Sequence, residues 1–138
     1  MKALGLDLGD KTLGVAISDQ NQSLARPLTT IRFTREDFTE ALHQLESLLQ
    51  AEHIDTIVLG LPKTLRGEIG AQGEKVLTFE TELKKITKIK IVLWDERLTT
   101  KIAHQSMLTS QVSRKKRKRN IDQEAATFIL QGYLDCLS

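Results

Sequence analysis

Cysteine is almost absent from this sequence, which has Cys136 alone among its 138 residues. A single cysteine cannot form an intramolecular disulfide, and this favours a reducing, cytoplasmic compartment. Aromatic residues make up only 4% of the chain, so few side chains can stack on unpaired bases. No apolar run approaches the length of a membrane span, and Asp7 interrupts the N-terminal run too early for a signal peptide. We expect a cytoplasmic protein with no membrane partner.

An excess of one charge is also lacking, since 20 Lys and Arg residues face 18 Asp and Glu residues. The formal net charge of +2 therefore does not by itself predict a polyanionic partner. The distribution of charge is more informative, because residues 114–119 are six consecutive cations. With 40% hydrophobic residues, the chain fits one domain, 1–138, around one core.

The order of apolar patterns predicts an α/β protein. Residues 3–8 and 13–18 are expected to form a hairpin, followed by a strand at 28–31, because Pro27 is tolerated only at a strand start or edge. Helical periodicity follows at 35–52, a buried strand at 57–59, a second helix, and a strand at 89–94. Two more helices are expected, one capped by Thr99 or Thr100 and one starting near Asp122. The second helix should turn inward the stripe Val76, Phe79, Leu83 and Ile86.

This order predicts a mixed five-stranded sheet flanked by helices, with three antiparallel N-terminal strands and then alternating helices and strands. Ligands bind such sheets near the carboxyl ends of the strands. Asp7 and Glu96 both lie at such ends, which makes them the first candidates for a functional site.

Asp7 is an acid within the apolar run ALGLDL, where its desolvation is costly without a cation or hydrogen-bond donors. Phosphodiester hydrolysis commonly uses two divalent ions about 4 Å apart, and Mg²⁺ prefers a few carboxylates plus water and phosphate. Asp7 is therefore a candidate metal ligand. The alternative is that its side chain caps the turn at Gly9.

Asp95 and Glu96 form the second acidic candidate, at the end of the strand IKIVLW. Strand alternation sends the two side chains to opposite faces, so only one should face the site. Glu96 is preferred and Asp95 is held in reserve. The alternatives are a helix cap for Asp95 and an ion pair with Arg97 for Glu96.

Asp122 is the third acidic candidate, although an acid in the first turn of a helix also complements the macrodipole. The basic run before it strengthens the functional interpretation, because it could hold a polyanion while Asp122 holds a metal. A solvated loop is the alternative for that run. Nucleic-acid binding through phosphates would depend steeply on salt and carry little sequence preference. The run comprises Arg114, Lys115, Lys116, Arg117, Lys118 and Arg119.

The segment after the buried strand, Gly60 to Gly67, could bring backbone amides, Lys63 and Arg66 to a phosphate. An ordinary strand-to-helix connection is equally compatible with it. Lys11 and Arg97 complete the candidate nucleic-acid-binding residues. His43, His53 and His104 lack metal-ligand spacing.

Four segments in order, LDLGDKTLGVA at 6–16, GLP at 60–62, DERLTT at 95–100 and IDQEAA at 121–126, resemble the YqgF (RuvX) family. The resemblance covers nearly the whole chain. It implies a ribonuclease H-like fold related to the Holliday junction resolvase RuvC, with Mg²⁺ or Mn²⁺ as cofactor. It places the family's acidic positions at Asp7, at the Asp95–Glu96 pair with Glu96 preferred, and at Asp122.

The resemblance implies a hydrolase acting on ester bonds, with two proposed family roles. One is 5′-end processing of precursor 16S ribosomal RNA, with ribosomal particles as further partners. The other is resolution of branched DNA, which would need a homodimer, whereas RNA trimming could use a monomer. A non-catalytic RNA-binding module for ribosome assembly is the alternative outside enzymes. A two-domain kinase of the actin-like type is disfavoured, because 138 residues supply one domain.

Overall fold

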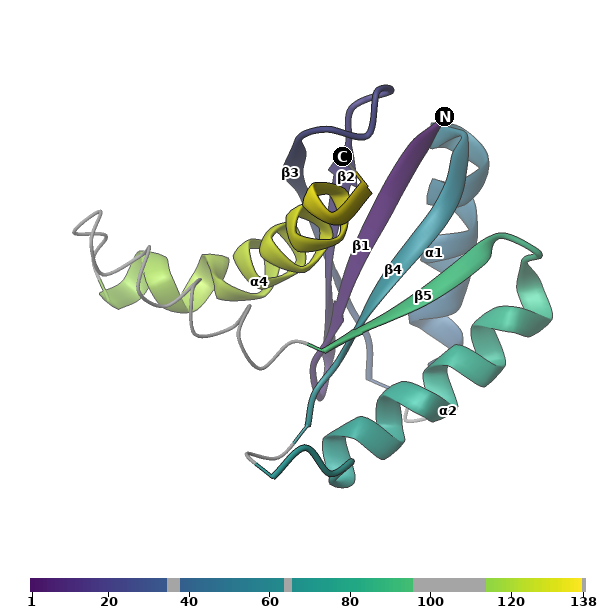
Figure 1. Cartoon of the computed structure of the whole chain (residues 1–138). Helices are drawn as coiled ribbons and strands as arrows, with labels where there is room; N and C mark the ends of the chain where they lie inside the picture. Colours follow the sequence, from purple (N-terminus) through teal and green to yellow (C-terminus); the bar gives the residue numbers. More distant parts are fainter. Residues whose placement is uncertain (35–37, 64–65, 96–113, 138) are drawn as a thin grey trace.

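A computed structural model of the chain describes residues 1–34, 38–63, 66–95 and 114–137, with the backbone alone described over 114–123. These residues form one five-stranded sheet with helices on both of its faces (Figure 1). The elements are β1 (Lys2–Leu8), β2 (Thr12–Ser18), β3 (Ala25–Arg32), α1 (Thr39–Glu52), β4 (Ile54–Leu61), α2 (Ala71–Ile86), β5 (Lys90–Asp95) and α4 (Arg114–Leu137).

The strand order is β3-β2-β1-β4-β5, with β1 at the centre. β1 and β2 pair antiparallel, as do β2 and β3, whereas β4 runs parallel to both β1 and β5. The predicted mixed sheet is therefore confirmed. The carboxyl ends of β1, β4 and β5 meet at one edge of the sheet, where a ligand site is expected.

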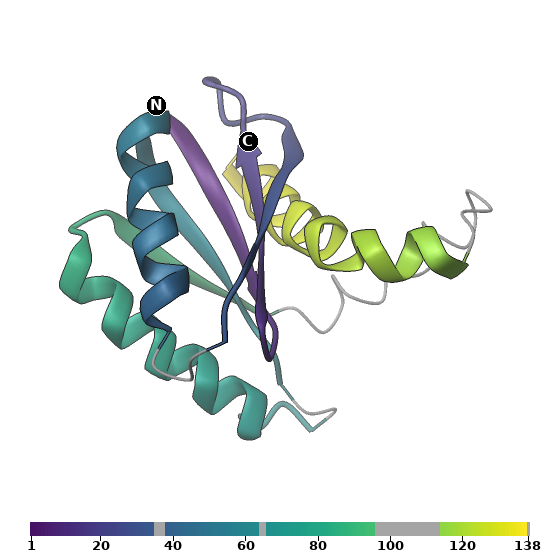
Figure 2. The same ribbon diagram turned by 180° about the vertical axis from the view of Figure 1, so that it is seen from behind.

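Two apolar layers hold the helices against the sheet. Leu4, Leu6 and Leu8 of β1 point into the larger layer, beneath α1 and α2, together with the predicted stripe of α2. Ala3 of β1 and Val58 of β4 point into the smaller layer, beneath α4. The view from behind shows α1 and α2 on the face opposite α4 (Figure 2). Alternate residues of each strand thus face different helices.

The predicted hairpin and strands are confirmed. Gly9 N donates a hydrogen bond to Thr12 O over 2.7 Å, which closes the turn between β1 and β2. β3 is longer than predicted and contains Pro27 opposite Ala16, beside a bulge in the pairing of β2 with β3. A proline is tolerated there because β3 is an edge strand.

The last helix begins eight residues earlier than predicted, at Arg114 rather than near Asp122. The solvated-loop interpretation of residues 114–119 is therefore wrong. Lys and Arg have high intrinsic helix propensity, and solvent screens repulsion between exposed like charges. The predicted helix carrying Ile102, Ala103 and Leu108 lies outside the described residues. None of the described helices is long and apolar enough to cross a membrane.

Candidate active site at the carboxyl end of the central strand

Asp7 lies half-buried near the end of β1, between the buried side chains of Leu6 and Leu8. Since Leu6 and Leu8 point toward α1 and α2, alternation turns Asp7 toward the face that α4 covers. Asp7 pairs with Gly14 of β2. On the other side, Leu6 pairs with Leu59, so the next position of β4, Gly60, lies beside Asp7.

Asp7 is therefore flanked on both neighbouring strands by glycine. Gly60 in turn pairs with Trp94 of β5, and Gly14 pairs with Thr30 of β3. On the α4 face, one residue from each of the five strands thus lies in a single row, with the Asp7 carboxylate in the middle. The row is Thr30, Gly14, Asp7, Gly60 and Trp94. Because neither adjacent residue has a side chain, no side chain of this row stands directly beside the carboxylate on β2 or β4.

Asp95 lies on the other face of the sheet. It pairs with Leu61 of β4, which belongs to the larger apolar layer beneath α1 and α2. Asp95 and Asp7 therefore point away from each other, as alternation along β5 and β1 requires. Glu96 and Arg97 lie outside the described residues.

Gly5 brings α4 into close contact with β1. A Cβ atom added at Gly5 would lie 2.7 Å from Leu130 Cβ and 2.8 Å from the carbonyl oxygen of Ala126. Leu134 and Leu137, at the other end of the helix, line the same pocket as Met1. α4 therefore runs antiparallel to β1, and its backbone at Asp122, one turn before Ala126, lies toward the carboxyl end of β1.

The start of α4 removes one alternative interpretation of Asp122. An acid that complements a helix macrodipole acts within the first turn, and the first turn of α4 contains none. Asp122 is instead the ninth residue of a helix that begins at Arg114. Residues 114–119 occupy the turns before it, so the basic run and Asp122 belong to one helix.

The candidate cations outside α4 are separate from one another in sequence and have different exposure. Lys11 is exposed in the β1–β2 turn, Lys63 is half-buried after β4, and Arg66 is exposed before α2. Gln72 near the start of α2 donates from Nε2 to the carbonyl oxygen of Leu8 over 2.9 Å. α2 is thereby tied to the end of β1, next to Asp7.

Several of these features could not be recognised from residue types alone. Gly5 and Gly14 were not predicted as site residues, and Gly60 was predicted only as part of a possible phosphate-binding segment, although all three lie on the face of the sheet that carries Asp7. The strand register of the structure is what places Gly14 and Gly60 beside Asp7, and the contact with Ala126 and Leu130 places Gly5 beneath α4. Gln72 gives no sequence signal, because its partner is a backbone carbonyl 64 residues away.

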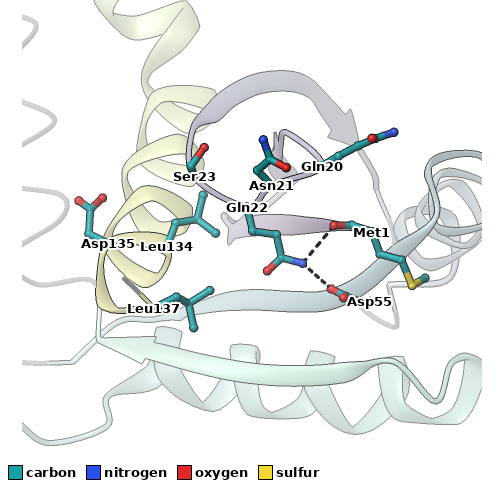
Figure 3. A pocket seen from close by; sticks show the side chains of 9 residues that line it. All are labelled: Met1, Gln20, Asn21, Gln22, Ser23, Asp55, Leu134, Asp135 and Leu137. Carbon is teal, nitrogen blue, oxygen red and sulfur yellow. Dashed lines mark hydrogen bonds between the residues drawn. The ribbon is translucent and has the colours of Figure 1, made fainter.

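A hollow of about 510 Å³ lies at the opposite end of the sheet from Asp7. Figure 3 shows it between the β2–β3 turn, the N-terminus and the end of α4. Gln22 spans it, donating to Met1 O over 3.2 Å and to Asp55 Oδ1 over 2.9 Å. In the same turn, the backbone N–H and then the hydroxyl of Ser23 bind Asp19 and lower the pKa of its carboxyl group. None of the residues that line this hollow is a predicted site residue.

Gln131 fixes α4 to this turn. Its Oε1 accepts from Ala25 N over 2.8 Å, and its Nε2 donates to Ser23 O over 2.9 Å and to Asp135 Oδ1 over 2.9 Å. We expect Gln131→Ala to lower the free energy of unfolding by about 1–2 kcal/mol, since two backbone groups lose their partner. Urea denaturation measures this, with Gln50→Ala on the exposed side of α1 as the control. Equal losses in both variants would contradict the assigned role.

The strand order with an acid at the carboxyl end of its central strand defines the ribonuclease H-like class of folds. RuvC from T. thermophilus, solved in complex with a Holliday junction substrate, has a similar fold: the TM-score is 0.61 at 12% identity, covering 100% of this chain and 97% of that one. A likeness at this identity shows the fold alone.

The sequence comparisons show the family. The family model described as RuvX, Holliday junction resolvase, matches residues 1–136, and the chain belongs to this family. A relative from Clostridium botulinum is 49% identical over 138 residues, covering 100% of this chain and 99% of its own. Another, from Caldanaerobacter subterraneus subsp. tengcongensis, is 48% identical over 136 residues, covering 98% and 96%.

Both relatives carry the name "Putative pre-16S rRNA nuclease". The predicted class of the chain is thereby confirmed: it is a nuclease, a hydrolase of ester bonds that acts on nucleic acid.

Proposed function

We propose that this chain cleaves precursor 16S ribosomal RNA near its 5′ end, using Asp7, Glu96 and Asp122 as a carboxylate centre for Mg²⁺ or Mn²⁺. The observation that supports the centre most directly is the position of Asp7, half-buried at the carboxyl end of the central strand and flanked by glycines. The names of the relatives support the choice of RNA.

Glu96 is preferred to Asp95 as the second ligand because Asp95 lies on the face of β5 that points away from Asp7. Asp95 shares the side of Leu61, opposite Asp7, so continued alternation would turn the next side chain toward Asp7. Asp122 is the third ligand, because the contact of Gly5 with Ala126 brings the preceding turn of α4 toward the end of β1. Glu96 lies outside the described residues and Asp122 is described by its backbone alone, so both assignments are argued from the positions of Asp95 and Ala126.

The donor set suits a hard divalent cation. Three carboxylates offer oxygen ligands alone, as Mg²⁺ and Mn²⁺ prefer, and the half-buried Asp7 benefits from a compensating cation. Among the described side chains no three His, Cys, Asp or Glu residues gather, since Asp7 is the one proposed ligand described in full. Bound at this edge, such ions supply activation of water and stabilisation of the leaving oxygen.

The surrounding residues would position the phosphodiester. Lys11 adjoins Asp7 through the β1–β2 turn, and Lys63 follows β4 at the same edge of the sheet. Arg66, Arg97 and the cations at 114–119 would hold phosphates further along the chain of the substrate. Because these contacts are to phosphates, affinity should depend on salt far more than on base sequence.

Resolution of four-way DNA junctions is the second candidate function, favoured by the description of the matching family. That reaction cuts two strands and therefore requires two centres, as in a homodimer. Trimming one RNA end requires one centre, so a monomer could perform it, and ribosomal particles would then be its natural partners. The solution mass of the active species bears directly on this choice.

The test compares two substrates under identical conditions. The purified protein, with Mg²⁺ or Mn²⁺, receives either a precursor 16S RNA fragment that retains its 5′ extension or a four-way DNA junction. We expect a higher initial rate on the RNA, with a product that ends at a defined position. Faster, paired cuts in the junction would instead assign the resolvase function.

A further inference from the structure

The end of β1 is held differently on its two sides. Its pairing with β2 continues to Leu8, whereas its pairing with β4 ends at Leu6. Gly9 N, in the peptide that follows Leu8, donates to Thr12 O on the β2 side. The N–H and C=O groups of a trans peptide point in opposite directions, so the carbonyl of Leu8 points away from β2. It therefore faces the side on which strand pairing has already stopped.

Gln72 supplies a partner for this carbonyl. Its Nε2 donates to Leu8 O over 2.9 Å, across 64 positions of the sequence. Figure 1 shows the start of α2 at the end of the sheet where the β1–β2 turn lies. A backbone carbonyl is an obligatory acceptor, and the half-buried Gln72 reaches it here in place of a strand. Gln72 thus does for the last peptide of β1 what a neighbouring strand does for the earlier ones.

The backbone of Gln72 is itself fixed to the end of β4. A Cβ atom added at Gly73 would lie 2.9 Å from Pro62 O, directly after β4, so α2 approaches this segment closely. Val76 and Phe79, in the next two turns of α2, are fully buried in the larger apolar layer. The side-chain amide of Gln72 is therefore carried by a rigid support and can define where the end of β1 lies.

A second contact between α2 and the hairpin is much weaker. Lys75 Nζ lies 3.2 Å from Asp10 Oδ1, but both side chains are more than half exposed, at 53% and 79%. Exposed ion pairs are screened by water and salt and contribute little. The contact of Gln72 with Leu8 is partly buried, so it holds the hairpin against α2 more firmly.

We propose that Gln72 is a positioning residue for Asp7. By holding the carbonyl of the next residue, it fixes the direction of the last peptide of β1 and thereby the direction of the Asp7 carboxylate. This role rests on the proposed function, in which Asp7 is a metal ligand. Because α2 covers the face of the sheet opposite Asp7, Gln72 acts through the backbone of β1 and not as a further ligand (Figure 2).

The experiment compares two glutamines that bind backbone groups at opposite ends of the sheet. Gln72→Ala removes the contact with Leu8 O, and Gln131→Ala removes contacts of the same kind at the β2–β3 turn. Isothermal titration calorimetry measures the affinity of the full chain for Mn²⁺ alone, without nucleic acid. Urea denaturation gives the stability of each variant. Amide hydrogen exchange at Gly9, relative to Gly5 in the centre of β1, reports how firmly the end of β1 is held.

We expect both variants to lose stability, and Gln72→Ala alone to bind Mn²⁺ about tenfold more weakly. This is the low end of the range of about 10–100-fold for groups that support metal ligands, since Gln72 acts through the backbone. Exchange at Gly9 relative to Gly5 should be several-fold faster in Gln72→Ala. It should be unchanged in Gln131→Ala, because that contact lies at the other end of the sheet.

Two further substitutions at position 72 separate hydrogen-bond donation from charge. Gln72→Glu keeps the shape of the side chain and removes the donor at neutral pH, whereas Gln72→Lys keeps a donor. A simple effect of charge predicts stronger Mn²⁺ binding by Gln72→Glu and weaker binding by Gln72→Lys. Positioning predicts the reverse order, with weak binding by Gln72→Glu and affinity largely restored in Gln72→Lys.

Parental Mn²⁺ affinity in Gln72→Ala, with stability lost as in Gln131→Ala, would show that the contact serves stability alone and would overturn the proposal. The order of affinities expected from charge would overturn it as well. Absent Mn²⁺ binding by the parent chain is a separate result. It would refute the carboxylate centre and, with it, the role of Gln72 toward a metal, whereas faster exchange at Gly9 in Gln72→Ala would still show that Gln72 holds the end of β1.

Discussion

Replacing Asp7 with asparagine should abolish metal-dependent cleavage and leave the fold intact. The asparagine side chain would keep the size and shape of the original one while removing the negative charge that the proposed cation needs. Loss of a group that hydrogen-bonds to a metal ligand typically lowers metal affinity or activity by about 10–100-fold. Loss of the ligand itself should therefore lower the cleavage rate by on the order of a hundredfold or more. Initial rates with Mg²⁺ and with Mn²⁺, on whichever substrate the parent cleaves, measure the effect.

Stability separates this effect from unfolding. Because asparagine keeps the shape of the half-buried aspartate side chain, the substitution should change the melting temperature little in the absence of metal. The added metal should raise the melting temperature of the parent and not that of the variant, because ligands that bind the folded state stabilise it. Nucleic-acid affinity should be largely retained, since the cations at 114–119 are unchanged.

Asp10→Asn is the matched control, three residues away in the same hairpin. Asp10 is exposed and forms a surface ion pair with Lys75, at 3.2 Å, whose loss should have little effect on stability or cleavage. Full cleavage by the Asp7 variant in a pure preparation would refute the proposed centre. A parent that binds RNA and cleaves nothing under any metal would instead support the non-catalytic assembly module.

The sequence predicted the elements well where the pattern is local. The inner stripe of α2 and the buried strand β4 follow from periodicity within about ten residues, and both are confirmed. The start of α4 was missed because the basic run has no apolar periodicity, while its helix propensity is high. Local signals thus determine most elements and fail where a helix leaves the core.

The candidate site was predicted only in part, because its geometry depends on contacts between distant residues. Asp7 was found from its own surroundings, an acid in an apolar strand. The face of Asp95 became clear only from its pairing with Leu61 in a parallel neighbour. The approach of α4 to β1 depends on Gly5 and Ala126, which are about 120 residues apart, and no local pattern encodes that contact.

That contact makes Gly5 the second position where one substitution should have a large effect. An added methyl group would stand 2.8 Å from the backbone oxygen of Ala126 and 2.7 Å from Leu130 Cβ. Neither atom can be moved by rotating a side chain, and truncation of Leu130 to alanine would keep its Cβ. Gly5→Ala therefore requires β1 and α4 to separate, which we expect to cost about 1–3 kcal/mol in the free energy of unfolding.

The same separation should reduce cleavage beyond the loss of stability. Gly5 precedes Asp7 by two strand residues, about 6.6 Å, and Asp122 precedes Ala126 by one helical turn, about 6 Å. Pushing α4 away from Gly5 would therefore move Asp122 relative to Asp7. We expect the metal concentration for half-maximal cleavage to rise several-fold even at temperatures where the variant is fully folded, because misplacement by 1 Å can cost about a hundredfold in rate.

Gly132→Ala provides the control on the opposite side of the same interface. Its added Cβ would meet the indole of Trp94 at 3.0 Å, a side chain that is half-buried and able to shift, and alanine gains about 1 kcal/mol in helix propensity over glycine. We therefore expect a smaller change in unfolding free energy than for Gly5→Ala, and little change in metal dependence. If both variants keep the parental metal dependence, the close approach at Gly5 serves packing alone, and the position of Asp122 must be fixed elsewhere along α4.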